Sequence, residues 1–264
     1  MTSVQSHSAC IGVFDSGVGG LSVLRALRGR LPGVPLRYLA DSAHAPYGGR
    51  EAAHIIGRSL ALTQRLLEDG ATLIVVACNT ATVQAIAALR ERWPALPFIG
   101  VEPGIKPAAA QTRTGRIAVM ATAATVASAR VQRLVEQHAG DAEVLLQGCS
   151  GVVDVIERAD GDSAALLEVL RPYCERVRAF GADTVVLGCT HYPFVEPQIR
   201  ELLGSAVQII DTAQAIAERA ASLWSGATSN GASLTLQTTG DPQALARMAA
   251  QWLCHDGDAT RVMV

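Results

Sequence analysis

The sequence of 264 residues predicts an α/β protein with two similar, doubly wound parallel-sheet domains that face each other across a cleft. Short apolar runs typical of strands alternate with longer segments of helical pattern, and this alternation favours a mostly parallel sheet. The strand runs are apolar throughout, as expected of strands covered by helices on both faces. A weak internal repeat indicates that the pattern is built from two halves.

The expected strands and helices follow one another along the chain. Each strand is a short run rich in Val, Ile and Leu, and each helix is longer, with apolar residues at helical spacing. The first expected elements are strand 11–14, helix 21–31, strand 36–39, helix 51–67, strand 73–77, helix 82–93 and strand 98–101. The later expected strands are 117–120, 144–146, 184–187, 207–210 and 234–237.

The internal repeat predicts how the domains divide the chain. Residues 11–16 resemble residues 117–122, and the segment around Cys78 resembles the segment around Cys189, 111 residues further on. We therefore expect two domains related by pseudo-twofold symmetry. The first would contain residues 1–103 together with 211–264, and the second residues 104–210. A single (β/α)₈ barrel is the alternative architecture for a chain of this length.

Composition and charge exclude several kinds of partner. The 22 basic and 24 acidic residues give a net charge of −2, and neither sign forms a block, so we expect no nucleic acid or membrane surface as partner. No apolar run is long enough to span a bilayer, and residues 1–9 lack a basic leader, which favours a cytoplasmic protein. The six cysteines are widely spaced, so we expect neither disulfides nor a metal site.

Two cysteines carry the strongest chemical signal. Cys78 and Cys189 each follow an apolar strand and precede a helix, where helix amides and the helix dipole would favour a thiolate. A buried cysteine is more often a small apolar side chain, and that is the interpretation for the remaining cysteines, Cys10, Cys149, Cys174 and Cys254. The polar neighbours of Cys78 and Cys189 are costly to bury, which favours a functional role for this pair.

Two further segments end strands and carry polar residues. Asp15 and Ser16 precede the glycine-rich turn 17–20, whose main chain could approach an anion, although its spacing matches no nucleotide fingerprint. Helix capping is the simpler interpretation of this pair. The loop 41–50 contains Tyr47 and two glycines and is long enough to fold over a cleft, but it could also be a surface turn.

Together, five segments resemble the signature segments of bacterial glutamate racemase: 13–20, 41–48, 77–81, 105–108 and 187–193. They occur in order between about residue 11 and residue 211. The resemblance implies a cofactor-independent enzyme of the aspartate/glutamate racemase superfamily that interconverts L- and D-glutamate for peptidoglycan. It also implies that Cys78 and Cys189 lie on opposite faces of the substrate, with Cys78 acting on the D isomer and Cys189 on the L isomer.

The same resemblance implies supporting residues. Asp15 would lie near Cys78, and His191 and Glu157 near Cys189, completing the catalytic set. The implied substrate contacts are Asp15, Ser16, Tyr47, Gly48, Asn79, Thr80, Thr122, Thr125, Thr190 and His191. This sequence departs from the family pattern at 149–154, which bears on the placement of Glu157, and at Val131. Glutamate is the expected small-molecule partner. A homodimer is possible, but the sequence does not decide the oligomeric state.

The chemistry of racemisation fits a pair of thiols. Inverting an α-carbon requires a base on one face and an acid on the other, so one cysteine must be a thiolate while the other is a thiol. Pyridoxal phosphate chemistry would need a Schiff-base lysine, and Lys106 is the one lysine in the chain. No phosphate loop accompanies it, so we expect no cofactor.

Other functions remain open at this point. A related racemase or isomerase could act on aspartate, a hydantoin or maleate, because the pocket and not the thiol pair sets the substrate. A thiol hydrolase would leave the second cysteine unexplained. A two-lobed amino-acid-binding module would need neither thiol.

Overall fold

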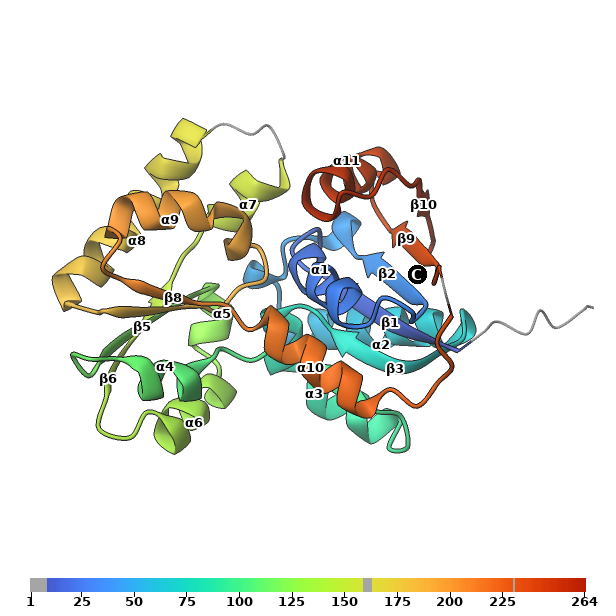
Figure 1. The fold of residues 1–264 in the computed structure, drawn as a ribbon, viewed down its shortest axis with the longest axis horizontal. Helices are drawn as coiled ribbons and strands as arrows, with labels where there is room; N and C mark the ends of the chain where they lie inside the picture. The colour runs from blue at the N-terminus through green and yellow to red at the C-terminus, as the bar shows by residue number, and fades with distance from the viewer. Residues whose placement is uncertain (1–8, 159–162, 230) are drawn as a thin grey trace, which may run out of the picture.

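The computed structural model describes residues 9–158, 163–229 and 231–264, which form two open parallel sheets flanked by helices (Figure 1). The predicted fold class, an α/β protein with two parallel-sheet domains, is confirmed. The alternative of a single (β/α)₈ barrel is wrong, because the strands pair into two separate sheets that each end in edge strands.

The first sheet has the strand order β10-β9-β2-β1-β3-β4, with every neighbouring pair parallel. Its strands are β1 (Cys10–Asp15), β2 (Leu36–Ala40), β3 (Ala71–Val76), β4 (Phe98–Gly100), β9 (Leu234–Thr238) and β10 (Ala259–Arg261). One face is covered by α1 (Leu21–Arg30), α10 (Ala213–Leu223) and α11 (Pro242–Leu253), and the other by α2 (Ala52–Glu68) and α3 (Asn79–Arg92). The central strand β1 is buried along its whole length, which explains its continuous apolar pattern.

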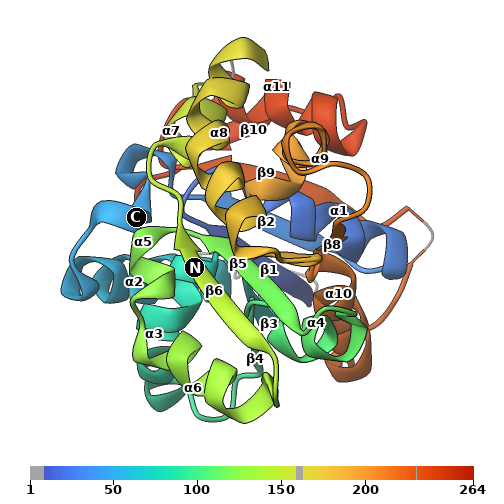
Figure 2. The same cartoon turned by 90° about the vertical axis from the view of Figure 1, so that its left-hand side faces the viewer.

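The second sheet has the order β6-β5-β7-β8, again all parallel. Its strands are β5 (Arg116–Ala121), β6 (Glu143–Gly148), β7 (Thr184–Leu187) and β8 (Gln208–Ile210). In Figure 2 this sheet lies in front, with α8 and α9 above it and α4 and α6 below it. Its helices are α4 (Ile105–Gln111), α5 (Ala123–Val126), α6 (Ala129–His138), α7 (Val152–Glu157), α8 (Ser163–Phe180) and α9 (Glu196–Leu203).

The internal repeat seen in the sequence corresponds to a repeated strand order. The order β2-β1-β3-β4 in the first sheet matches β6-β5-β7-β8 in the second, so β1 corresponds to β5 and β3 to β7. Helix α10 returns to the first sheet and contacts α1, whereas α4 packs on the second sheet. The domain boundaries themselves, at residues 103/104 and 210/211, stay a prediction.

All strands expected from the sequence are present, with ends within two residues of the predicted ones. The sequence missed β10, because its three residues, Ala-Thr-Arg, are half-buried or exposed and form no apolar run. Helix α3 begins three residues earlier than expected, at Asn79, because the thiol of Cys78 caps it by accepting the N–H of Ala81. Cys78, which the sequence analysis selects for its chemistry, is therefore also the residue that caps α3.

Candidate active site

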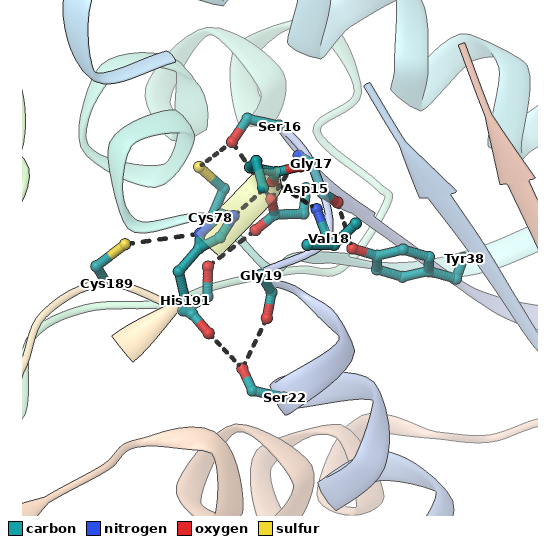
Figure 3. A network of polar contacts seen from close by, with 12 residues as sticks. Asp15, Ser16, Gly17, Val18, Gly19, Ser22, Tyr38, Cys78, Cys189 and His191 are labelled. Atoms are coloured by element: carbon teal, nitrogen blue, oxygen red, sulfur yellow. Dashed lines mark hydrogen bonds and ion pairs between the residues drawn. The ribbon is translucent and has the colours of Figure 1, made fainter. Parts of the chain in front are cut away.

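The two thiols stand at corresponding places in the two sheets. Cys78 follows β3 and Cys189 follows β7, at the carboxyl edge where open α/β sheets bind ligands. The Cys78 thiol donates to Ser16 Oγ at 3.6 Å, and its sulfur accepts the N–H of Ala81 at 3.4 Å. The sulfur of Cys189 lies 3.7 Å from Nδ1 of His191 (Figure 3). Each thiol thus has its own polar neighbours.

Burial controls the protonation of Cys78. It raises the pKa of this thiol to about 12, with a further contribution from the nearby charge of Asp15. The N–H of Ala81 and the hydroxyl of Ser16 act in the opposite direction but are weaker. The expectation that the helix N-terminus would make Cys78 a thiolate is therefore wrong, because desolvation outweighs one amide contact.

Asp15 connects the surroundings of both thiols. Its Oδ1 accepts the Gly17 N–H at 2.7 Å and the Ser16 hydroxyl at 3.3 Å, so it reaches Cys78 through Ser16. Its Oδ2 accepts the hydroxyl of Thr190, next to Cys189, at 2.9 Å. Asp15 is fully buried. Its side chain therefore joins the first sheet to the loop after β7 of the second.

The glycine-rich turn 17–20 makes room for the second domain. A Cβ atom on Gly17 would overlap the carboxylate of Glu157, and one on Gly19 would overlap the ring of His191. The main-chain N–H of Val18 donates to Oε1 of Glu157 at 2.8 Å. The anion that this turn binds is thus a carboxylate of the chain itself, presented at the end of α7.

His191 and Glu157 form a charged pair next to Cys189, in which His191 is buried and Glu157 is partly exposed. His191 Nε2 lies 2.6 Å from Glu157 Oε1. Burial by itself would lower the pKa of His191, but hydrogen bonds to Cys189 and Glu157 outweigh it and raise that pKa well above 6.5. Burial likewise opposes ionisation of Glu157, yet its contacts with His191 and the Val18 N–H lower its pKa. His191 is therefore a cation that presents one N–H to the sulfur of Cys189.

A cluster of hydroxyls lies where the two domains meet. Thr80, in the first turn of α3, places its hydroxyl 3.0 Å from that of Thr122 and 3.2 Å from that of Thr125. Thr122 and Thr125 are 2.9 Å apart, and Thr122 caps α5. Asn79 donates to the carbonyl of Val101, whereas its side-chain oxygen is buried without a partner among the described residues.

These side chains surround a narrow cavity of about 10 Å³, which is room for about one water molecule. Its lining consists of Ser16, Pro46, Tyr47, Gly48, Cys78, Asn79, Thr80, Thr122, Val153, Cys189, Thr190 and His191. The cavity adjoins a wider hollow of about 200 Å³, which shares Pro46, Gly48, Thr122 and Val153 with it.

The structure brings the site residues expected from the sequence into one place. Ten of them line the cavity, and the other three, Asp15, Thr125 and Glu157, hold lining residues from behind. Pro46 and Val153 were missed, because an apolar side chain near a motif carries no chemical signal. The loop 41–50 folds into two short 3₁₀ helices, η1 (Ser42–His44) and η2 (Tyr47–Gly49), and places Gly48 against Thr122.

Residues 9–158, 163–229 and 231–264 form neither a metal centre nor a membrane-spanning helix. No group of three or more His, Cys, Asp or Glu side chains in these ranges is arranged to hold a metal ion. Within the same ranges no helix combines the length and the apolar character that crossing a membrane requires.

Asp15 should make the protein less stable as the pH rises. Burial raises its pKa from 3.8 to about 6, so between these values the native state binds more protons than the unfolded chain. The free energy of unfolding should then fall by about 2 kcal/mol from about pH 4 to about pH 7. Urea unfolding of wild type and Asp15→Asn across this range tests it. The difference between the two proteins should change by that amount, and a difference independent of pH would contradict the assignment.

The fold and the site together define the class. The chain has two parallel-sheet α/β domains, and a thiol from each lines one shared cavity. The Asp/Glu/Hydantoin racemase family model matches residues 21–220. The chain belongs to this family and, within it, to the glutamate racemases.

Similarity to individual glutamate racemases extends over most of the chain. The protein from Pseudomonas aeruginosa is 50% identical over 217 residues, covering 81% of this chain and 80% of that protein. The protein from Herpetosiphon aurantiacus is 48% identical over 244 residues, covering 90% and 95%.

Solved structures of glutamate racemases are similar to this chain over almost its whole length. The glutamate racemase isoform RacE1 of Bacillus anthracis has a TM-score of 0.88 and 29% identity, covering 98% of both chains. The enzyme from Francisella tularensis, solved in complex with D-glutamate, has a TM-score of 0.85 and 25% identity, again covering 98% of both chains.

Proposed function

We propose that this protein interconverts L- and D-glutamate by proton transfer between the α-carbon and the thiols of Cys78 and Cys189. The observation that carries the proposal is that one thiol from each domain lines the same cavity. Its relatives are named glutamate racemase, and one was solved with D-glutamate bound. The product D-glutamate would serve peptidoglycan synthesis.

The mechanism follows from the unequal surroundings of the thiols. The raised pKa of Cys78 means that this thiol carries its proton at neutral pH, so it can act as the acid. For L-glutamate, Cys189 would remove the α-proton from one face and Cys78 would return a proton to the other. For D-glutamate the roles exchange. Asp15, through Ser16, acts on Cys78, and His191 with Glu157 acts on Cys189.

The carbanion formed between the two transfers needs stabilisation. The hydroxyls of Ser16, Thr80 and Thr190, the amide of Asn79 and the charge of His191 surround the narrow cavity and supply oriented dipoles there. Lys106 is exposed and lies outside this lining, so it is not placed to form a Schiff base with a ligand there. In the proposed mechanism, side chains of the protein alone stabilise the carbanion.

The decisive experiment is chiral analysis of glutamate after incubation with purified protein in D₂O, with no cofactor added. Both L- and D-glutamate should approach a racemic mixture, with deuterium at the α-carbon of the product. An amino-acid-binding module would bind glutamate without incorporating deuterium. A requirement for pyridoxal phosphate, or loss of activity on dialysis against a chelator, would overturn the cofactor-independent mechanism.

Two further expectations from the sequence belong to the same proposal. The protein is expected to be cytoplasmic, and cell fractionation would test this location. A homodimer would be tested by sedimentation of the purified protein.

A further inference from the structure

A buried carboxylate outside the cavity holds the loop that forms one of the cavity walls. Asp41 follows β2 directly and is fully buried. Its Oδ2 accepts the hydroxyl of Tyr47 at 2.5 Å and Nε of Arg58 at 2.9 Å. Its Oδ1 accepts Nη2 of Arg58 at 2.8 Å and the hydroxyl of Thr239 at 2.9 Å. Both oxygens are therefore fully used, two of the contacts forming a bidentate Arg–carboxylate pair.

Arg58 extends this support to the end of the chain. It lies on α2 with a side chain only 14% exposed, and its remaining nitrogen, Nη1, donates to the main-chain oxygen of Val264 at 2.8 Å. Val262 donates its N–H to the main-chain oxygen of Thr238, the last residue of β9. Val262 and Val264 pack on the apolar cluster that contains Tyr47. One guanidinium thus ties residues 262–264 to the carboxylate that holds the loop.

The hydrogen bond to Asp41 also decides what Tyr47 can offer a ligand. The phenol donates its proton to Asp41, and burial together with the charge of Asp41 raises the pKa of Tyr47, so that proton stays in place. Tyr47 cannot donate the same proton to a substrate carboxylate. Its role at the cavity is to set the position of the 46–48 segment, including Gly48, which packs against Thr122.

We propose that Arg58 is a positioning residue of the substrate site, which fixes the Tyr47–Gly48 wall through Asp41 and makes residues 262–264 part of the support of that wall. Arg58 does not line the cavity, so it acts through Asp41 and through residues 262–264. This inference rests on the proposed function, because the wall it positions is the one that would limit the length of glutamate.

The test compares Arg58→Ala and Arg58→Lys with a matched control, Arg65→Ala. Arg65 lies seven residues further along the same helix and pairs with Asp69, away from the loop. Arg58→Ala should raise KM for both enantiomers on the order of tenfold or more, with a smaller effect on kcat, because a displaced wall weakens binding of both. The KM of Arg58→Lys should lie between those of wild type and Arg58→Ala, since one ammonium cannot replace a bidentate guanidinium. Arg65→Ala should keep the wild-type KM.

Two further measurements separate positioning from stability alone. Added methylguanidinium should lower the KM of Arg58→Ala and leave that of Arg65→Ala unchanged. Deleting residues 262–264 should raise KM in the same sense. A wild-type KM in Arg58→Ala, or a fall in melting temperature that matches Arg65→Ala without a change in KM, would overturn the proposal.

A readout independent of activity distinguishes this proposal from the proposed function. Hydrogen exchange of peptides covering 41–50 should be faster in Arg58→Ala than in wild type and unchanged in Arg65→Ala. If wild type does not racemise glutamate, the proposed function fails while this measurement still decides the positioning role. Unchanged exchange in the loop of Arg58→Ala rejects that role whatever the activity.

Discussion

Replacing either Cys78 or Cys189 by alanine should lower kcat for glutamate racemisation by at least about a thousandfold in both directions. Each thiol is the proton carrier on its own side of the cavity, so removing one leaves one face of the α-carbon without acid or base. His191 also lines the cavity, but its Nε2 is engaged with Glu157, and it lies on the side of Cys189. It cannot replace Cys78.

Cys149→Ala is the matched control for these variants. Cys149 is also a buried thiol after a strand, and burial raises its pKa to about 12, but it lines the outer hollow and not the cavity. Its variant should keep turnover within a few-fold of wild type, as measured by circular dichroism or chiral chromatography. Near-normal turnover in Cys78→Ala or Cys189→Ala would rule out the two-thiol mechanism. Racemisation lost with only one of the two would instead favour a mechanism with a single essential thiol.

Glutamate should be racemised about a hundredfold faster than aspartate. Aspartate is one methylene shorter, so anchoring both of its carboxylates would pull the α-carbon away from one thiol, and a misplacement of about 1 Å can cost that much. The groups expected at the two ends of the substrate belong to different elements. Asn79 and Thr80 lie on α3, whereas Tyr47 and Gly48 lie on η2. Asp41 and Arg58 hold η2 in place, which leaves little slack for a shorter substrate.

Competition in one tube tests this selectivity directly. L-Glutamate and L-aspartate are mixed at equal concentration in D₂O, and deuterium uptake at each α-carbon is followed by NMR. Equal rates would place the protein with aspartate-directed members of the family. Arg58→Ala offers an internal comparison, because a looser wall should reduce the preference for glutamate over aspartate.

Sequence reasoning located the site because the strand-end rule depends only on local order. Apolar runs ending in Asp15, Cys78, Thr122 and Cys189 place these residues at the carboxyl edges of β1, β3, β5 and β7, whatever the details of packing. Glu157 came from resemblance alone, and the structure places it against His191. Its catalytic role stays a prediction.

Properties that depend on burial and on contacts between distant segments could not be predicted from the sequence. The raised pKa of Cys78 reflects how completely the two domains cover it, which its neighbours in sequence do not reveal. The contact between Arg58 and Val264 joins positions 206 residues apart, and Arg58 looks like any helix arginine. Asp41 did carry a signal, since it is a polar residue directly after a strand, but its partner could not be named.

The unequal surroundings of the two thiols act within a thermodynamic limit on the two directions of reaction. Mirror-image amino acids have equal free energies in water, so the equilibrium constant is one and kcat/KM must be the same from either side. Cys78 has Ser16 beside it, and Cys189 has His191 with Glu157. These unequal neighbours can make kcat differ between the two enantiomers only if KM differs between them in the same proportion. The scaffold can therefore let one enantiomer bind tightly and turn over slowly, while the other binds weakly and turns over fast, without shifting the balance between them.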